Sequence, residues 1–192
     1  PSGGYSIARS VRLRKSATAY FNRTAGSAAT DGTKWTISCW VKRGILDSGA
    51  SLLYTLMSAE PAATTYLSFY QDTIYFQIND GGAGRVLQTT QVFRDPSAWY
   101  HCVFVWDRGA ATASQKMRLY INGSEVTSFS TDNRSSISGS ASPGILTQSV
   151  SNTIGRRAGA SADYYDGYIT EFNAIDGQAL TPSSFGETDS IT

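Results

Sequence analysis

The chain is poor in charge, cysteine and histidine, and each shortage excludes a class of protein. Charged residues make up 16% of the 192 residues, below the usual share of about a quarter. The formal net charge of +1 predicts no general attraction to nucleic acid. Two cysteines are too few for a disulfide framework. No apolar run approaches the length that spans a bilayer, so we expect no membrane insertion.

The residues that are abundant point to β-structure. The chain holds 18 Gly, 11 Tyr, 8 Phe and 4 Trp, a composition typical of a β-rich domain with many turns. In the segment 34–43, Trp35, Ile37, Cys39 and Val41 alternate with the residues between them, which predicts a strand. The dipeptide Asn122-Gly123 between two β-rich runs predicts a hairpin, because both residues tolerate positive φ.

The same reasoning along the chain predicts an all-β domain of two antiparallel sheets packed face to face, a jelly-roll β-sandwich with less than about 10% helix. Residues 1–9 are expected to form an N-terminal arm, and residues 10–192 a single domain. One short helical turn is expected after Thr181, as N-cap, and Pro182. Residues 131–150 are expected to form a long loop that is either functional or mobile. The expected strands are 10–13, 18–22, 34–43, 51–58, 66–70, 73–79, 85–90, 98–107, 116–122, 125–129, 152–156 and 167–175.

Four blocks, in order along the chain, resemble the laminin-G-like, concanavalin A-type jelly rolls. The resemblance implies the same two-sheet sandwich over residues from Ser10 to about Gly186. The blocks are Trp35–Lys42, Trp99–Asp107, Leu119–Val126, and Ile154–Arg156 followed by the turn Tyr165-Asp166-Gly167.

Two further segments, 93–101 and 175–187, resemble the version of this domain carried by virion proteins of tailed bacteriophages. That resemblance implies a non-enzymatic structural or interaction module: a head decoration, head fibre or tail component, assembled into the virion in the host cytoplasm. Its partners would be other capsid or tail proteins, and a homo-oligomer is compatible with this setting. The alternative is a lectin-like adhesin that binds glycans of the host cell surface.

An enzyme is the least favoured class. Glycoside hydrolases on this fold place two or three carboxylates along one strand face, and no Glu-x-Asp-x-x-Glu run is present. Glu171 and Asp176 have opposite parity on a regular strand, so we expect them on different faces. The one histidine, His101, has no acidic neighbours in a triad pattern, and we expect it to be structural.

Exposed aromatic rings beside amide-rich and glycine-rich loops are the pattern expected of a sugar site, because flat rings cover sugar faces and amides bind hydroxyls. Most aromatics at alternate strand positions pack in the core instead. Tyr164 and Tyr165 are the strongest candidates, since neighbours on a strand cannot both point inward. The other ligand-binding candidates are Trp40 and Tyr70, with Tyr66 and Tyr75 nearby in sequence.

No cofactor is required by any motif, although the resemblance implies calcium as one alternative, held by carboxylates and carbonyls at the rim of the sandwich. Calcium takes six to eight oxygen ligands. The candidate ligands are Asp80, Asp107, Asp163 and Asp166, all at expected turns. Aspartate is also a routine turn former, so the alternative that these four residues only form turns stays open.

Two further expectations concern Cys39 and Cys102, and the N-terminal arm. Each cysteine lies in an apolar strand, and we expect two small buried hydrophobic residues, with a disulfide between neighbouring strands as the alternative. The arm lies beside Arg9, Arg12 and Arg14, which suits docking on an acidic neighbour. The alternatives are an inert leader and a solvated basic strand edge.

Overall fold

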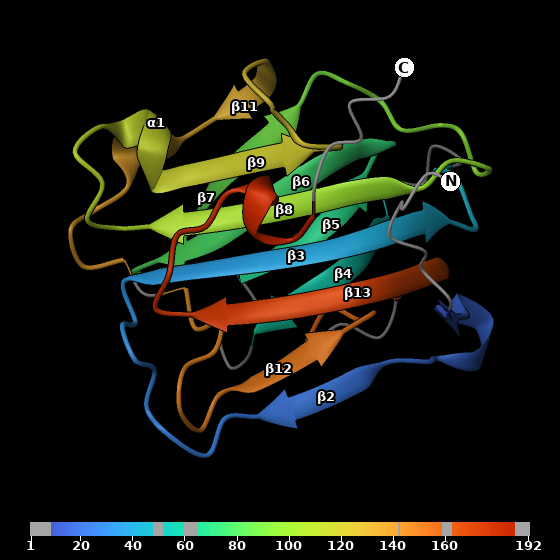
Figure 1. The fold of residues 1–192 in the computed structure, drawn as a ribbon, viewed down its shortest axis with the longest axis horizontal. Helices are drawn as coiled ribbons and strands as arrows, with labels where there is room; N and C mark the ends of the chain where they lie inside the picture. The colour runs from blue at the N-terminus through green and yellow to red at the C-terminus, as the bar shows by residue number, and fades with distance from the viewer. Residues whose placement is uncertain (1–8, 48–51, 60–64, 142, 159–162, 187–192) are drawn as a thin grey trace, which may run out of the picture.

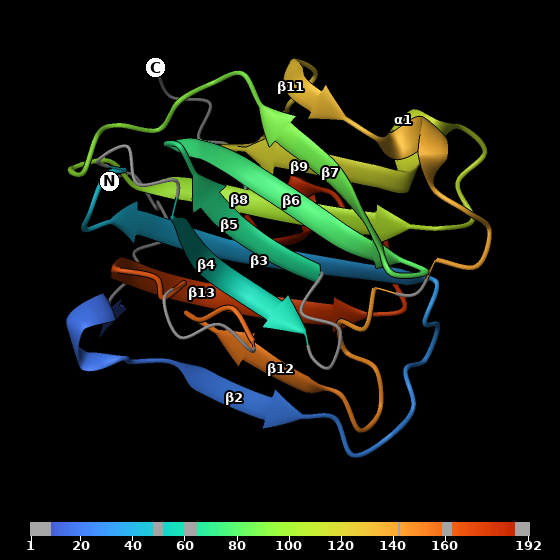
Figure 2. The same ribbon diagram turned by 180° about the vertical axis from the view of Figure 1, so that it is seen from behind.

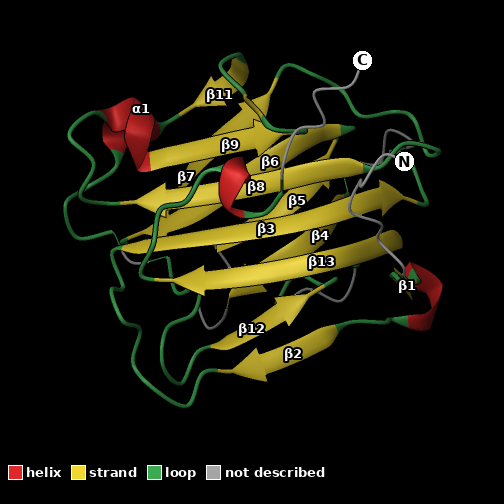
Figure 3. Ribbon diagram, in the orientation of Figure 1, coloured by secondary structure: helices red, strands yellow, loops and turns green. Residues whose placement is uncertain are grey.

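Two antiparallel β-sheets packed face to face make up the described part of the chain (Figure 1). The structure is a computed structural model, and it describes residues 9–47, 52–59, 65–141, 143–158 and 163–186. Figure 3 shows that strands dominate and that the helical turns are short. Among these residues no helix is both long and apolar enough to cross a bilayer. The expected all-β sandwich is therefore confirmed.

The first sheet, sheet A, has six strands, and the second, sheet B, has seven. In spatial order sheet A is β1 (Val11–Leu13), β13 (Gly167–Asp176), β3 (Lys34–Arg43), β8 (Tyr100–Asp107), β9 (Met117–Ile121) and β10 (Ser124–Glu125). Sheet B is β11 (Phe129–Asp132), β7 (Ala83–Thr89), β6 (Thr73–Asp80), β5 (Thr65–Tyr70), β4 (Leu53–Ala59), β12 (Ser151–Ile154) and β2 (Phe21–Thr24). The helical pieces are α1 (Ala113–Lys116) and the 3₁₀ turns Lys15–Ala17, Arg134–Ser136 and Pro182–Ser184.

Two of the predicted strands are wrong in detail, each for a local reason. The strand expected to begin at Thr18 begins at Phe21, because a 3₁₀ turn precedes it and ends at Thr18 with φ of 48°. The single strand expected over 125–129 is split between β10 in sheet A and β11 in sheet B, so the chain changes sheets there.

Tight turns fix the register of the β9–β10 hairpin, which the sequence predicts, and of the β5–β6 hairpin. Asn122 and Gly123 have φ of 49° and 84°, and Gln71 and Asp72 have φ of 49° and 60°. Positive φ at both central residues defines the type I′ turn, whose twist matches that of the flanking strands. The β9–β10 and β5–β6 hairpins therefore follow directly from their turn residues.

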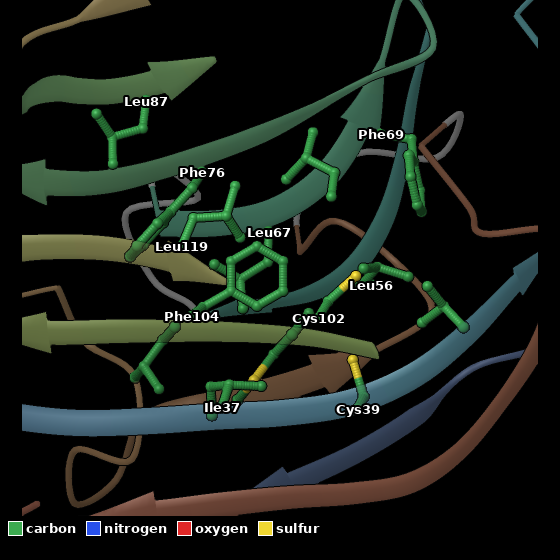
Figure 4. Close-up of a cluster of buried hydrophobic side chains, with 14 of the residues drawn as sticks. Ile37, Cys39, Leu56, Leu67, Phe69, Phe76, Leu87, Cys102, Phe104 and Leu119 are labelled. Atoms are coloured by element: carbon green, nitrogen blue, oxygen red, sulfur yellow. The ribbon is translucent and has the colours of Figure 1, made fainter. Parts of the chain in front are cut away.

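The core lies between the sheets and draws on both of them (Figure 4). Ile37 and Phe104 come from sheet A, while Leu67 and Phe76 come from sheet B, and all four are wholly buried. Burying one such side chain contributes about 1.5–3 kcal/mol. β8 is also covered on its outer face, where Ala179 and Phe185 pack on a small cluster of Val103, Val105 and Tyr120.

The two cysteines are directly opposite each other in β3 and β8, and Figure 4 shows both in the core. Both are free thiols and fully buried. Burial raises the pKa of Cys39 to about 12 and raises the pKa of Cys102 as well. The expectation of two small buried hydrophobic residues is confirmed, and the alternative of a disulfide is not.

The expected loop over residues 131–150 is partly β11 and a 3₁₀ turn, and its middle packs into the core. Ile137, Ala141 and Ile145 are at most 6% exposed and belong to the main hydrophobic cluster. The length of this segment therefore has a structural cause: it covers one side of the sandwich with apolar residues that no strand supplies.

A buried ion pair holds one end of the sandwich together. Arg43, 1% exposed, places Nη1 2.8 Å from Oδ1 of Asp72 and donates from the same nitrogen to the carbonyl of Phe93 at 2.6 Å. Asp72 also accepts from the backbone N–H of Asp47 at 2.8 Å and from Nε of Arg94 at 2.9 Å. The carboxylate thus links the end of β3 to the β5–β6 turn and to the segment that precedes β8.

Candidate functional site

Three tyrosines come together on the outer face of sheet B. Every second side chain of β5 and β6 points into the core, among them Leu67, Phe69 and Phe76. The side chains between them point to the opposite face of the sheet. Figure 2 looks onto this side of the molecule, with β4 to β7 toward the viewer. We call the outward group formed by Tyr66, Tyr70, Tyr75 and Gln77 the tyrosine face.

The tyrosine rings contact one another across the hairpin. The rings of Tyr66 and Tyr75 are stacked, with centroids 5.8 Å apart and planes 9° apart. Tyr70 meets Tyr75 edge to face at 5.5 Å. The β5–β6 register pairs Tyr66 with Gln77 and Tyr70 with Thr73, so each tyrosine pair is diagonal, a distance that aromatic side chains span. The type I′ turn therefore sets the arrangement of the rings.

One amide fixes two of the phenols. The hydroxyls of Tyr66 and Tyr75 both donate to Oε1 of Gln77, at 3.1 Å each. Gly84 on the neighbouring strand β7 leaves the room that this amide occupies, because a Cβ there would lie 2.7 Å from Cδ of Gln77. The rings are thus held in place before any ligand arrives, which lowers the entropy lost on binding.

The phenols of Tyr66 and Tyr75 are neutral near pH 7. Burial raises the pKa of Tyr75 to about 12. Burial likewise raises the pKa of Tyr66, more than the nearby Arg157 lowers it. The hydroxyls therefore stay protonated and serve as hydrogen-bond donors and acceptors.

A charged pair lies at the border of the tyrosine face. The guanidinium of Arg157 lies over the Tyr66 ring, 4.7 Å from its centroid, and its Nη1 is 3.1 Å from Oδ2 of Asp163. The next residue, Ala158, donates its N–H to the hydroxyl of Ser58 on β4 at 2.7 Å. The segment after β12 is thereby anchored beside the hairpin, and it brings a cation and an anion to the rings.

The predicted ligand-binding residues do not gather in one place. Tyr70 lies on the tyrosine face. Trp40 lies on β3 in sheet A, stacked on His101 with ring centroids 4.9 Å apart. Tyr164 is only 8% exposed, because the exposed Tyr20 packs on it with the two ring centroids 6.2 Å apart.

Tyr165 belongs to the core and offers no surface to a ligand. It is wholly buried, stacks on Phe69, and donates its hydroxyl to the carbonyl of Lys42 at 2.9 Å. The inference that one of the two neighbouring tyrosines must be exposed is wrong, because the segment around Tyr20 covers the outward one. The role predicted for Tyr165 is therefore corrected to packing.

The four predicted calcium ligands each have another partner. Asp80 pairs with Arg85, and Asp163 pairs with Arg157. Asp107 caps the N–H of Gly109, and Asp166 accepts the N–H of Lys15. Within the ranges that the structure describes, no group of three or more His, Cys, Asp or Glu side chains is placed to hold a metal ion. Their local role is that of turn and strand-end formers.

The parity argument for Glu171 and Asp176 does not hold, because β13 is not regular. Its register against β3 shifts between Thr170 and Asn173, and Glu171 takes φ of 48° at that bulge. The two carboxylates line different hollows on the surface. Asp176 accepts the backbone N–H of Thr30 at 2.6 Å.

Most of the predicted N-terminal arm, residues 1–8, lies outside the described residues, so its docking role stays a prediction. The neighbouring Arg12 faces its own domain. Its guanidinium lies 5.1 Å from the centroid of the Tyr168 ring and donates to the hydroxyl of that residue at 3.0 Å. It also lies 3.9 Å from Asp166.

Sequence reasoning missed Gln77 and Arg157. Gln77 could have been found from the position of the β5–β6 turn, because the register that this turn sets places Gln77 opposite Tyr66. Arg157 lies about ninety residues further along the chain, so its approach to the rings depends on the strand order of sheet B.

The sequence matches the family model described as the concanavalin A-like lectin/glucanases superfamily over residues 15–184. The chain belongs to this superfamily. The expected jelly-roll resemblance is therefore confirmed. A search of curated proteins found no sequence match.

Solved structures share the superfamily fold at low sequence identity. The binding domain of Paraclostridial Mosquitocidal Protein 1 is 14% identical, with a TM-score of 0.64. The match covers 92% of this chain and 42% of the chain of that binding domain. Domain 4 of AbnA, a GH43 extracellular arabinanase from Geobacillus stearothermophilus in complex with arabinotriose, is 22% identical with a TM-score of 0.54, covering 95% of this chain and 77% of that one. The CBM40 of the Ruminococcus gnavus IT-sialidase is 13% identical, with a TM-score of 0.51. That match covers 86% of this chain and 94% of the CBM40 chain. These likenesses show the fold alone.

Proposed function

We propose that this chain is a non-enzymatic carbohydrate-binding module that uses the tyrosine face. The observation that carries the proposal is the cluster of Tyr66, Tyr70 and Tyr75 on one sheet face, held by Gln77 and bordered by Arg157. Tyr70 and Tyr75 are only partly buried, so they present ring surface that the faces of a sugar can cover.

The chemistry of the tyrosine face matches a polyhydroxylated ligand. Flat rings bury the C–H faces of a sugar, while phenol, amide and guanidinium groups bind its hydroxyls. Two similar folds support this class of ligand: the arabinanase domain is described in complex with arabinotriose, and the sialidase domain is a CBM40.

The test is a glycan array followed by titration calorimetry of the best ligand. We expect Tyr70→Ala and Tyr75→Ala to weaken binding about tenfold or more, as for a central aromatic contact. Tyr75→Phe keeps the ring and removes the hydroxyl, so its effect should be smaller. Tyr168→Ala removes a tyrosine from the other sheet and is the matched control, with binding expected to be unchanged.

Two outcomes count against the proposal. One is an array on which no glycan is retained. The other is a ligand whose affinity is the same in Tyr70→Ala, Tyr75→Ala and wild type. Release of reducing ends from a bound polysaccharide, lost on changing a single carboxylate, would overturn the non-enzymatic assignment.

For the setting, we propose the particle of a tailed bacteriophage, where the module attaches to capsid or tail proteins and to glycans of the host surface. Support comes from the resemblance of residues 93–101 and 175–187 to phage virion proteins. In the structure, Phe93 and Phe185 of these segments serve packing. Fractionation of purified particles is the measurement, and a chain that never co-purifies with virions at fixed stoichiometry would refute this setting.

A further inference from the structure

The C-terminal segment crosses the outer face of sheet A, opposite the tyrosine face. Figure 1 shows its red turn lying across the strands of that sheet. The hydroxyl of Thr36 on β3 donates to the carbonyl of Gln178 at 2.8 Å and accepts the N–H of Leu180 at 2.9 Å. Phe185 packs on the small apolar cluster of β8 and β9. The segment is therefore fixed at both ends of the turn that contains Pro182.

The hollow between this turn and the strands beneath it measures about 620 Å³. Ligand pockets typically enclose about 300–1,000 Å³. We call it the sheet A groove. Its main lining residues are Trp40, His101, Asn122, Thr181, Ser183 and Phe185.

The floor of the groove is a rigid pair of flat rings. Trp40 is only partly buried and stacks on His101 with an angle of 17° between the planes. Nε2 of His101 lies 2.8 Å from the hydroxyl of Ser38, and the backbone N–H of His101 donates to Oδ1 of Asn122 at 2.8 Å. The ring pair is thus held from below by Ser38 and at its edge by the type I′ turn.

The groove carries no formal charge. Among the described residues that line it there is no Asp, Glu, Lys or Arg. Burial lowers the pKa of His101, so the imidazole is neutral near pH 7. Besides His101, the polar side chains that line the groove are the amide of Asn122 and the hydroxyls of Tyr120, Thr181 and Ser183. They suit an uncharged ligand rich in hydroxyls and not an anion or a cation.

We propose that the sheet A groove is a second sugar-binding site, which takes a neutral hexose ring stacked on Trp40. The turn hydroxyls and the Asn122 amide bind the hydroxyls at the rim of that ring. The site is independent of the tyrosine face, because the two lie on opposite outer faces of the sandwich. A proline-rich peptide also binds aromatic grooves, but the hydroxyl and amide groups around this hollow favour a sugar.

The test uses the full chain and an array of uncharged oligosaccharides of glucose, galactose and mannose, with affinities then measured by titration calorimetry. We expect at least one ligand whose affinity falls about tenfold or more in Trp40→Ala and less in Ser183→Ala. Trp40→Phe should retain most of the affinity, because it keeps a flat ring. The control is Trp99→Ala, a tryptophan that directly precedes β8 and does not line the groove, and it should bind like wild type.

Thermal melting of each variant separates loss of binding from loss of folding, and Ser183→Ala provides a second probe that leaves the Trp40–His101 stack intact. The proposal is overturned if every uncharged ligand depends on Tyr70 and none on Trp40, because all binding then belongs to the tyrosine face. It is also overturned if no uncharged sugar binds, or if a proline-rich peptide binds in a Trp40-dependent way and sugars do not.

Discussion

Removing the buried cation at the end of β3 is the sharpest test of how this sandwich is held together. In Arg43→Met the methionine fills much of the space between the Tyr54 and Phe69 rings, which lie 6.0 and 4.8 Å from the guanidinium carbon. The change removes the 2.8 Å pair with Asp72 and the hydrogen bond to the Phe93 carbonyl.

The contacts of Arg43 and Asp72 place the expected loss of stability at the lower end of the range for buried ion pairs. Deleting one partner of a buried pair costs about 3–5 kcal/mol, because the other charge stays buried. Here Asp72 keeps Arg94 and the N–H of Asp47. In addition, Nε and Nη2 of Arg43 are buried and have no hydrogen-bond partner in the described structure, so their removal relieves a desolvation cost. We therefore expect the lower end, about 3 kcal/mol, which for a chain of this length lowers the melting temperature by about 6–12 °C.

The assay is urea denaturation and thermal melting of Arg43→Met, Asp72→Asn and the double variant, with Arg94→Met as control. Arg94 pairs with the same carboxylate but is 65% exposed, so its loss should cost about 0–1 kcal/mol. The double-mutant cycle should give a coupling of about 1–3 kcal/mol between Arg43 and Asp72. If Arg43→Met costs no more than Arg94→Met, burial is not what gives the pair its strength, and the reasoning fails.

Three other changes have definite outcomes. Gly123→Val, at φ of 84°, should destabilise the fold by about 1–3 kcal/mol, and an unchanged melting temperature would contradict the turn. Burial raises the pKa of Asp80, but hydrogen bonds from Ser138 and the nearby Arg85 lower it more, so the pKa lies below the ordinary 3.8. The ionised carboxylate therefore stabilises the fold at pH values above 3.8. This contribution to the free energy of unfolding is lost as the pH falls through the lowered pKa. Asp80→Asn should flatten this acid loss, and an identical pH profile would refute it. Cys39 and Cys102, buried with raised pKa values, should resist a thiol reagent at pH 8 until urea unfolds the chain; rapid labelling of the native protein would show that the strands open locally.

Local chemistry made the strands and hairpins predictable. Alternation gave β3 its residue range, and Asn122-Gly123 gave the β9–β10 turn because few other dipeptides accept two positive φ angles. The bulge at Glu171 and the 3₁₀ turn before Thr18 were not predictable, because neither has a local signal strong enough to override an apparently regular strand.

The candidate site was only partly predictable for a related reason. Aromatic residues at alternate strand positions look the same in sequence whether they face the core or the solvent. Tyr70 points outward from β5, whereas Tyr165 points into the core against Phe69. The segment that carries Arg157 is far away in the chain. Which ring is free for a ligand is decided by tertiary packing and not by strand pattern.

Sheet A also dictates when this domain can fold. β3, near the start of the chain, pairs with β8 on one side and with β13 on the other, and β1 has β13 as its partner in the sheet. A nascent chain that still lacks β13 has an unpaired edge on β3, and β1 has nothing to pair with. Such long-range pairing makes folding slow, so sheet A closes only once β13 has been synthesised. A chain truncated before Gly167 should therefore aggregate through the bare edge of β3.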